Sequence, residues 1–368
     1  MKTICFISDR NIYMKRIANY LTDLGYKVHI ICRHQNGLSV DNFHPKIVFH
    51  QLSSVNLKTK WKEMGKIFRE TNPDIVHLHY LTKDAILPIF FHNKRFKYII
   101  SVWGSDINLF STNYLNKFFQ NISLLFCDTI HTFSPYLESL ILRKFVFINK
   151  KKLKNITIGI DKKFLTRSSM DSRRFIIKKY NLAENTLLIL SFRQHKPVYN
   201  HHTTIKAICD VICKYPEARF IFTRGNFDEE YLKESLNLVK EKKVERYSIF
   251  IDKWLSDEEL AILINAAHVN INIPLMDGLP ASLLEIMATK SIPIISNLKN
   301  YHSFFRDGEN GFYLNNLTDE KTLADLIIKS LDNYDMYSAL FTRNNNRYIE
   351  QYQNWSHQSK LWLDLYNQ

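Results

Sequence analysis

The chain has 368 residues, of which 45% are hydrophobic and 23% are charged. This composition is typical of a folded globular protein rather than a disordered one, and the length suits two domains of average size. No apolar run reaches the roughly 18 residues that a membrane-spanning helix needs, and the short apolar stretch behind Met1 is expected to form a buried strand rather than a signal peptide. The five cysteines lack zinc-ligand spacing, so we expect buried free thiols and a cytoplasmic protein.

Positive charge is concentrated in the first part of the chain. Residues 1–170 contain 26 of the 50 Lys and Arg residues but 11 of the 36 Asp and Glu residues. Basic and aromatic side chains mix in segments 93–98, 117–119 and 142–145, the last of which runs towards Lys150–Lys152. This pattern suits attraction to an anionic membrane face or to a phosphate-bearing acceptor; the alternative is a composition bias that leaves solvated lysine faces. Nucleic-acid binding is not expected, because no helix-turn-helix, zinc-finger or RNA-recognition signature accompanies the charge.

The first half of the chain alternates between strand-like and helix-like segments. The expected strands are 3–8, 27–32, 47–51, 75–79, 98–102, 129–133 and 155–160. The expected helices are 13–24, 61–70, 85–92 and one that starts at 135. Regular alternation of this kind predicts an α/β fold with a doubly wound parallel sheet.

The pattern restarts after a hydrophilic stretch at residues 162–185, which we take as the domain boundary. The expected strands are 187–192, 218–223, 248–251 and 269–273, and the expected helices are 201–214, 228–242, one that starts at 256, and 281–288. Ser256 and Glu259 have the spacing of a capping box, which supports a helix start there. The last segment, 334–368, reads as two helices outside the alternation.

The most informative segment is Pro274–Glu285, which reads as a strand end, a tight turn and a helix start. Gly278 permits unusual backbone dihedrals, and Pro280 suits the first helical turn. The free amides and the dipole at such a corner favour an anion, while Asp277 and Glu285 could accept hydrogen bonds from sugar hydroxyls. A sugar nucleotide fits both requirements; the alternative is a surface turn with a solvated Glu285.

Basic and aromatic residues follow other strands of the second half. Arg193 and Lys196 come after the strand at 187–192 and could hold a diphosphate, although a solvated basic loop is the alternative. Trp254 follows the strand at 248–251 and could stack on a base, although a partly buried loop tryptophan is the alternative. Neither a dinucleotide-binding fingerprint nor a P-loop is present.

His77 and His79 lie on an expected buried strand, where we interpret them as core histidines whose nitrogens bond to backbone. No cluster of residues has metal-ligand spacing, so no metal site is expected.

The Asp277–Glu285 stretch resembles the acidic-x7-Glu motif of retaining GT-B glycosyltransferases of family 4. The resemblance continues through Met287–Ala288, Pro293–Ser296 and Asp307–Phe312. Ser101–Asp106 is similar to the family pattern Thr-x-His-Gly-x-Asp, with Trp103 in the place of the histidine.

The resemblance implies two doubly wound, Rossmann-like domains that face a cleft. Residues 1–165 would bind the acceptor, residues 166–335 would bind the nucleotide sugar, and helices in 336–368 would pack back onto the first domain. The implied reaction is metal-independent transfer of a sugar, with retained configuration, to a sugar acceptor. We expect this acceptor to be linked to a polyprenyl diphosphate in surface polysaccharide synthesis, which would place the protein peripherally on the inner face of the plasma membrane. Because Trp103 replaces the histidine, a non-catalytic nucleotide- or sugar-binding protein is the alternative.

The resemblance also assigns roles to particular residues. The catalytic group would be Asp277, Arg193 and Asp106, with Lys196 as the candidate substitute for a family lysine whose place is occupied by Val198. The donor-binding group would be Gly278, Leu279, Pro280, Ala281, Ser282, Glu285, Arg224 and Trp254. The acceptor side would contain Asp9, Arg10, Trp103 and Gly104. No cofactor is implied; the donor would be UDP- or GDP-linked and would act as a substrate.

Overall fold

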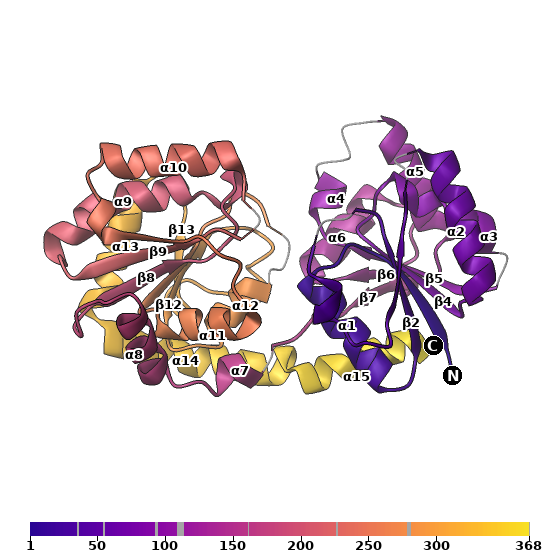
Figure 1. Cartoon of the computed structure of the whole chain (residues 1–368). Coiled ribbons are helices and arrows are strands. Elements are labelled where there is room, and N and C mark those ends of the chain that lie inside the picture. The colour runs from indigo at the N-terminus through magenta and orange to yellow at the C-terminus, as the bar shows by residue number, and fades with distance from the viewer. Residues whose placement is uncertain are drawn as a thin grey trace. The chain divides into compact units, whose positions relative to one another are not determined.

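The computed structural model describes residues 1–34, 37–53, 56–92, 95–108, 114–160, 162–225, 227–277 and 281–367. Internal contacts divide the chain into two compact units (Figure 1). The first unit consists of Met1–Ile158 and the C-terminal segment from Trp355, and the second unit consists of Gly159–Asn354. Each unit is an α/β fold built around one parallel sheet.

The first unit contains a seven-stranded parallel sheet with the order β3-β2-β1-β4-β5-β6-β7 among the described residues. Its strands are β1 (Thr3–Ile7), β2 (Lys27–Cys32), β3 (Val48–Gln51), β4 (Ile75–His79), β5 (Lys97–Val102), β6 (Thr129–Thr132) and β7 (Leu153–Asn155). Its helical segments are α1 (Ile12–Asp23), α2 (Leu57–Thr71), η2 (Lys83–Ile86), α3 (Ile89–His92), α4 (Ser105–Asn108), α5 (Tyr114–Phe126), α6 (Pro135–Lys144), η4 (Lys150–Lys152) and α15 (Trp355–Asn367).

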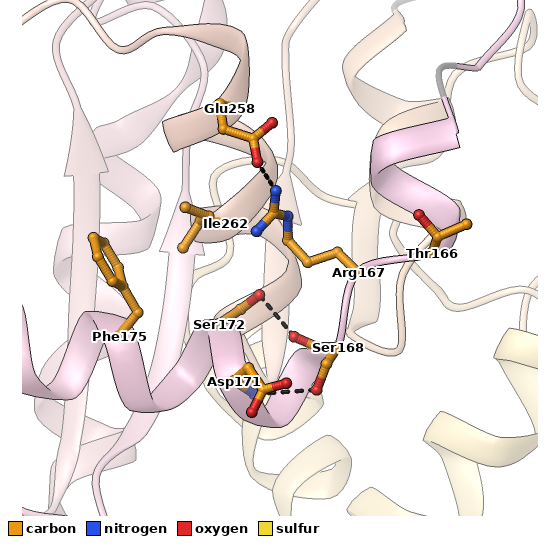
Figure 2. A pocket seen from close by; sticks show the side chains of 8 residues that line it. All are labelled: Thr166, Arg167, Ser168, Asp171, Ser172, Phe175, Glu258 and Ile262. Atoms are coloured by element: carbon orange, nitrogen blue, oxygen red, sulfur yellow. Dashed lines mark hydrogen bonds and ion pairs between the residues drawn. The ribbon is translucent and has the colours of Figure 1, made fainter.

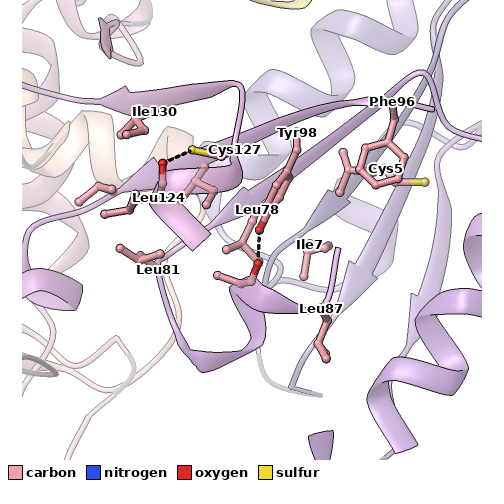
Figure 3. Close-up of a cluster of buried hydrophobic side chains, with 14 of the residues drawn as sticks. Cys5, Ile7, Leu78, Leu81, Leu87, Phe96, Tyr98, Leu124, Cys127 and Ile130 are labelled. Carbon is pink, nitrogen blue, oxygen red and sulfur yellow. Dashed lines mark hydrogen bonds between the residues drawn. The ribbon is translucent and has the colours of Figure 1, made fainter. Parts of the chain in front are cut away.

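The central strands of the first sheet are buried along their whole length, as expected for a parallel sheet covered by helices. One core cluster fills the space between the sheet and the helices on one face (Figure 3). Within it, the Tyr98 hydroxyl donates to the Ala85 carbonyl at 2.6 Å, which satisfies the polar end of a fully buried ring.

The C-terminal helix α15 completes the first unit. The indole of Trp362 donates to the Thr157 carbonyl at 2.9 Å, and the Lys2 ammonium donates to the Tyr366 carbonyl at 2.9 Å. The Tyr366 hydroxyl lies 2.9 Å from Nδ1 of His77 on β4. Residues from the two ends of the chain therefore share one core.

The second unit contains a six-stranded parallel sheet with the order β10-β9-β8-β11-β12-β13 among the described residues. Its strands are β8 (Leu187–Ser191), β9 (Ala218–Thr223), β10 (Ser248–Ile251), β11 (Val269–Asn272), β12 (Ile292–Ser296) and β13 (Phe312–Leu314). Its helical segments are α7 (Lys162–Leu165), α8 (Ser169–Lys179), η5 (Pro197–Tyr199), α9 (His201–Lys214), α10 (Glu229–Glu241), η6 (Glu245–Tyr247), α11 (Asp257–Ala266), α12 (Ala281–Met287), α13 (Glu320–Asp332), α14 (Tyr334–Tyr348) and η7 (Ile349–Gln353). Two separate core clusters are packed around this sheet.

Each sheet reverses its strand order at one point, between β1 and β4 in the first and between β8 and β11 in the second. In open parallel sheets, ligands bind beyond the carboxyl ends of the strands at such a reversal. The topology therefore selects one edge in each unit as the place to look for a site.

Several expected elements differ from the observed ones. The strand expected at 155–160 is β7 at Leu153–Asn155, where pairing with β6 ends. The helix expected at 85–92 is split into η2 and α3, because Pro88 has no amide to continue it. Cys213 is exposed and Cys209 half-buried, so the expectation of buried thiols is wrong for both.

Candidate functional site

The carboxyl ends of β8 and β11 bring together two residues that are 84 positions apart in the sequence. Arg193 lies two residues beyond β8, and Asp277 lies in the loop after β11. The Arg193 Nη1 donates to Asp277 Oδ2 at 2.7 Å. A charge pair therefore stands at the reversal point of the second sheet.

This ion pair is the centre of a polar cluster that we name the Arg193 site. It consists of Arg193, Tyr199, Asn272, Asp277 and Tyr301. The guanidinium lies over the Tyr199 ring at 4.3 Å from its centroid, and Nη1 also donates to Asn272 Oδ1 at 3.1 Å. The Tyr301 hydroxyl donates to Asp277 Oδ2 at 3.2 Å.

Burial and the neighbouring charges fix the protonation of the Arg193 site. The exposed side-chain fractions of Arg193 and Asp277 are 12% and 13%. Burial by itself would lower the pKa of Arg193, but the adjacent Asp277 carboxylate raises it above the ordinary value. Burial, and then the same carboxylate, raise the pKa of Tyr301 well above its ordinary value. The site therefore holds a cation and a neutral phenol donor at physiological pH.

The Arg193 site retains hydrogen-bonding capacity for a ligand. Only Nη1 of Arg193 bonds to the residues that the structure describes, so Nε and Nη2 have no partner there. Asn272 Nδ2 and Ser282 Oγ are buried and also lack a partner within the described ranges. Buried polar groups are seldom left unpaired in folded proteins, so these atoms suit a polar ligand.

The structure describes the segment Pro274–Glu285, the most informative part of the sequence, only in part. Gly278, Leu279 and Pro280 are outside the described residues, so their predicted role stays a prediction. The chain is described again from Ala281, where α12 begins, and Ala281, Ser282 and Glu285 are half-buried. The structure thus places Asp277 in the segment after β11 and Glu285 on α12.

Lys196 lies in the loop that follows Arg193. It is half-buried, and its ammonium makes no hydrogen bond or ion pair with the described residues. The loop itself is held by the Leu275 amide, which donates to the Val198 carbonyl at 2.8 Å. This bond ties the loop after β8 to the loop after β11.

Arg224 and Trp254 lie on the loops after β9 and β10. The Arg224 Nη1 is 3.4 Å from Asp252 Oδ1, and its guanidinium lies over the Phe227 ring at 3.8 Å. The Trp254 side chain is 61% exposed, which differs from the partly buried alternative and leaves the ring accessible for stacking. Neither residue contacts the Arg193–Asp277 pair in the described part of the chain.

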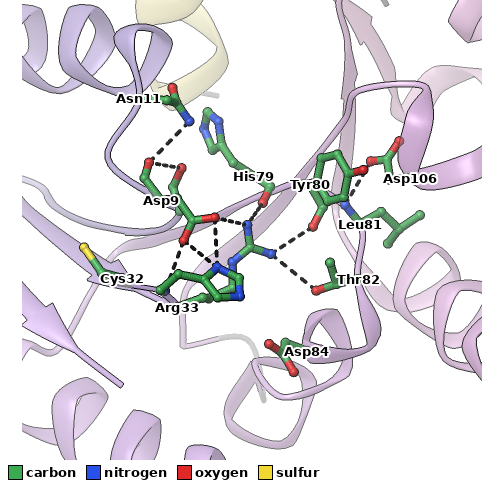
Figure 4. A network of polar contacts seen from close by, with 12 residues as sticks. Asp9, Asn11, Cys32, Arg33, His79, Tyr80, Leu81, Thr82, Asp84 and Asp106 are labelled. Carbon is green, nitrogen blue, oxygen red and sulfur yellow. Dashed lines mark hydrogen bonds and ion pairs between the residues drawn. The ribbon is translucent and has the colours of Figure 1, made fainter. Parts of the chain in front are cut away.

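The first unit contains a cavity of about 560 Å³ at the reversal point between β1 and β4. We name it the Arg33 cavity after the cation that organises its wall (Figure 4). Arg33 follows β2 and donates to the carbonyls of His79 at 3.0 Å and Tyr80 at 3.3 Å. It also lies 3.6 Å from Asp9, which follows β1. One guanidinium therefore joins the ends of three adjacent strands.

The wall of the Arg33 cavity contains an unusual number of unsatisfied polar atoms. Buried atoms without a partner among the described residues are Arg33 Nε, Asp84 Oδ1, Trp103 Nε1, Gln120 Oε1 and both ring nitrogens of His79. Burial lowers the pKa of His79 well below its ordinary value, so the ring is neutral at physiological pH and offers one donor and one acceptor. Donors and acceptors are thus both available for a ligand with hydroxyl groups.

Asp106 is enclosed by backbone amides, and its predicted catalytic role stays a prediction. It is fully buried, and its carboxylate accepts hydrogen bonds from the amides of Leu81, Trp103, Gly104 and Ile107. Burial raises the pKa of Asp106, and these amides partly offset that shift. Gly104 has a φ of 102°, which favours glycine. Asp106 and Gly104 therefore shape the turn that carries Trp103.

Trp103 lies in an aromatic wall of the Arg33 cavity. Its ring centroid is 4.8 Å from that of Tyr13 and 4.7 Å from that of Phe133. Arg10, the other predicted acceptor-side residue, forms a backbone bridge with Gly37 and is not among the described residues that line the cavity. The structure thus brings Asp9 and Trp103 to one cavity and leaves Arg10 beside it.

Sequence comparison with protein families identifies both units. The model described as glycosyl transferase 4-like matches residues 3–134, and the model described as glycosyl transferases group 1 matches residues 172–347. The chain is a group 1 glycosyltransferase. It uses a nucleotide-sugar donor, and enzymes of its family, family 4, typically retain the anomeric configuration. A comparison with curated proteins finds no significant match.

Solved structures of GT-B glycosyltransferases share the fold of this glycosyltransferase. Sucrose-phosphate synthase from Thermosynechococcus elongatus superimposes with a TM-score of 0.84 at 16% identity, covering 100% of this chain and 98% of that one. Anabaena HepE in complex with UDP and glucose gives 0.82 at 13% identity, covering 99% of both chains. WaaG, a glycosyltransferase involved in lipopolysaccharide biosynthesis, gives 0.78 at 12% identity, covering 100% and 99%. At these identities the likeness shows a common GT-B fold.

Sequence reasoning about the glycosyltransferase missed Arg33 and misread His79. His77 bonds to the Tyr366 hydroxyl at 2.9 Å and to the Ser101 hydroxyl at 2.7 Å, so its expected backbone partners are wrong. His79 has no partner among the described residues and lines the Arg33 cavity. Arg33 directly follows β2 and His79 is the last residue of β4, and these positions at strand ends near the reversal point were the available signal.

A second cavity of the glycosyltransferase, about 480 Å³, lies between α8 and α11 (Figure 2). Its main charged groups, Arg167 and Glu258, form an ion pair with each other. The Ser168 hydroxyl is used to cap α8 by accepting from the Asp171 amide. Arg167 Nε is buried without a partner among the described residues, and none of the residues that line this cavity belongs to the Arg193 site.

Proposed function

We propose that this glycosyltransferase binds a UDP- or GDP-linked sugar at the Arg193 site and transfers it, with retention and without a metal ion, to an acceptor held in the Arg33 cavity. The observation that carries the proposal is the anchored Arg193 guanidinium, whose Nε and Nη2 have no partner among the described residues. A fixed cation with open donors at a sheet reversal suits a diphosphate. The UDP complex of the structurally similar Anabaena protein supports a UDP-linked donor.

Charge at the leaving group decides the chemistry of this reaction. As the glycosidic bond breaks, the sugar gains oxocarbenium character and the diphosphate gains negative charge. Arg193 and Lys196 would stabilise that charge, and in comparable sites one well-placed donor contributes about 3 kcal/mol. The backbone amides of Leu279, Ala281 and Ser282 would add further donors. Among the described residues, the buried Ser282 hydroxyl has no partner and the Lys196 ammonium forms no hydrogen bond or ion pair, which supports these roles.

Carboxylates would orient the donor. Asp277 is held in place by Arg193 and Tyr301 and would accept hydrogen bonds from the donor sugar. Glu285 would hold the ribose hydroxyls. Arg224 and the exposed Trp254 would contact the nucleobase from the neighbouring loops, since stacking needs an accessible ring.

The acceptor would occupy the first unit. Its hydroxyls would bond to His79 and Trp103 Nε1, and Asp9 would hold Arg33 in position. Asp106 and Gly104 would act as positioning residues, because they shape the turn that carries Trp103. We further propose that the acceptor sugar is linked to a polyprenyl diphosphate, since the basic excess of residues 1–170 suits an anionic lipid group. This acceptor would bring the protein to the inner face of the plasma membrane.

Ligand binding tests the donor site first. Thermal unfolding is measured with UDP-, GDP- and dTDP-sugars; at about 100 times its dissociation constant, the correct donor adds about 2.7 kcal/mol of stability. Arg193→Gln should abolish this shift. Arg219→Gln is the control, because it removes a half-buried arginine at the amino end of β9, away from the site, and it should keep most of the shift. No shift with any sugar nucleotide would refute the donor assignment.

Turnover separates transfer from mere binding. Radiolabelled sugar is followed from the identified donor into a polyprenyl-diphosphate-linked acceptor and into the matching soluble sugar. Glu285→Ala should lower the turnover number by about 100-fold relative to the wild-type enzyme. Donor binding without transfer or donor hydrolysis would instead favour a non-catalytic binding protein. Equal use of the soluble acceptor would refute the lipid-linked one.

A further inference from the structure

The outer face of α5 presents apolar side chains to solvent. Its exposed residues other than Lys117 are Tyr114, Leu115, Phe118, Leu125 and Phe126, with exposed fractions between 51% and 91%. Val146 and Phe147, which follow α6, are 88% and 44% exposed. We name these seven apolar side chains the α5 face. Monomeric proteins rarely expose such a patch without a partner, because hydration of contiguous apolar surface is unfavourable.

Contacts place the end of α6 beside α4 and the segment after it at the carboxyl end of α5. The Lys144 ammonium donates to the Ile107 carbonyl at 3.3 Å, and repulsion from Lys117, secondary to burial, contributes to lowering the pKa of Lys144. The Lys152 ammonium donates to the Leu125 and Cys127 carbonyls at 2.8 Å each. Val146 and Phe147 lie between these two lysines in sequence, and we infer that they add to the exposed apolar surface near α5.

Exposed basic residues accompany the α5 face in the same part of the chain. Residues 114–154 contain seven Lys or Arg but two Asp or Glu. Lys117, Arg143, Lys144, Lys150 and Lys151 are all exposed. Aromatic and aliphatic side chains rimmed by lysines are the combination that enters the headgroup region of an anionic bilayer, where rings bury and ammonium groups meet lipid phosphates.

We propose that the α5 face docks on the surface of an anionic phospholipid bilayer without spanning it. No helix of the described ranges is long and apolar enough to cross a bilayer. The inner side of the same helix carries Asn116 and Gln120, which line the Arg33 cavity. A docked α5 would therefore place that cavity one helix away from the lipid headgroups. This inference goes beyond the proposed reaction and holds whether or not the acceptor is lipid-linked.

Charge and composition disfavour the other occupants of the α5 face. Two copies packed symmetrically through this face would bring two basic rims together, which is unfavourable. Nucleic acid would use the lysines but would leave the aliphatic Leu115, Leu125 and Val146 side chains exposed to water. A bilayer interface satisfies both the apolar centre and the basic rim.

Vesicle co-sedimentation of the full chain tests the proposal without any sugar substrate. The probes are neutral phosphatidylcholine vesicles and vesicles with about 30% phosphatidylglycerol. We expect binding to the anionic vesicles and weaker binding at high salt. Phe118→Ser/Phe126→Ser should reduce the partition coefficient by at least about tenfold, because two aromatic side chains no longer bury in the interface. Met170→Ser/Met336→Ser is the matched control, since these side chains are 58% and 56% exposed in the second unit.

The charge component has its own matched pair. Lys117→Gln/Lys151→Gln should weaken binding to anionic vesicles several-fold, whereas Lys58→Gln/Lys62→Gln, which removes two exposed lysines of α2, should not. Thermal unfolding of each variant verifies that it is folded. Vesicle binding that survives the Phe118/Phe126 change would overturn the proposal. So would wild-type binding to RNA or DNA but not to vesicles, or dimerisation that the Phe118/Phe126 variant abolishes while vesicles remain unbound.

Discussion

His77 and His79 form a matched pair on β4 that tests the interpretation of the Arg33 cavity. Both side chains are buried, with exposed fractions of 0% and 1%, and their ring centroids are 4.3 Å apart. Burial lowers the pKa of both well below the ordinary value, so both are neutral. They differ in their partners: His77 has two hydrogen bonds, whereas His79 has none among the described residues. Replacing each with Leu therefore removes the same group but not the same interactions.

The expected effects follow from the atoms that each change leaves behind. His77→Leu leaves the buried Tyr366 hydroxyl without its partner, while Ser101 keeps a contact with His131 at 2.8 Å. One unsatisfied buried hydroxyl costs about 1–3 kcal/mol, which for a unit of this size lowers the unfolding temperature by about 4–8 °C at the midpoint of that range. His79→Leu loses no hydrogen bond and buries an apolar group instead, so its stability should stay within about 0.5 kcal/mol or rise.

The assay combines unfolding with acceptor use. Thermal and urea unfolding of the first unit are followed for both variants, and initial rates are measured against acceptor concentration. We expect His79→Leu to keep its stability and to raise KM for the acceptor about tenfold, because a buried donor or acceptor group is lost from the cavity wall. Equal destabilisation by the two changes, or an unaltered acceptor KM in His79→Leu, would refute the view that His79 is reserved for a ligand.

Three further predictions concern the ion pair, acid stability and the turn at Asp106. Arg193→Gln should destabilise the second unit by about 3 kcal/mol because it leaves Asp277 nearly buried and unpaired, whereas Arg224→Gln should cost under about 1 kcal/mol; equal costs measured by urea unfolding would contradict this. Burial lowers the pKa of His131 to about 4, so between about pH 6.5 and 4 the unfolded chain binds a proton that the folded chain excludes. His131 therefore makes stability fall by about 1.4 kcal/mol for each unit by which the pH falls, in addition to the contributions of His77 and His79; His131→Gln should reduce the slope by that amount, and an unchanged slope would exclude His131 as a contributor. Asp106→Asn should destabilise the first unit by about 2 kcal/mol, because an amide group cannot accept all the backbone bonds that the carboxylate accepts; wild-type unfolding of this variant would argue against that role.

The alternation of elements was predictable because local patterns determine it. The capping box at Ser256 and Glu259 is present as expected, and α9 spans His201–Lys214 as expected. Helix α5 was not predicted, because its apolar residues occur on the exposed face as well as the buried one and give no single amphipathic stripe. The segment 93–98 was expected to present aromatic groups beside its basic residues, but Phe96 and Tyr98 belong to the core. A sequence pattern shows where apolar residues recur, but it does not show whether other residues of the chain cover them.

The candidate sites were predictable only where a residue type is informative on its own. Arg193 and Asp277 follow recognisable strand ends, so the sequence placed both at one edge of a sheet, and the structure joins them. Arg33 looked like any basic residue after a strand, because its carbonyl partners come from a strand more than 40 residues later. His79 was misread because the sequence pattern of a buried strand does not show whether a side chain faces packed residues or a cavity.

The split composition of the first unit has a consequence for synthesis on the ribosome. Residues 1–158 emerge early, but Trp362 and Tyr366, which fill that unit and bond to Thr157 and His77, are made almost last. The continuous second unit has all of its strands before then. The first unit of the nascent polypeptide therefore stays incomplete until α15 has been translated. A fragment that ends at residue 158 would lack α15 and could not complete the core of that unit.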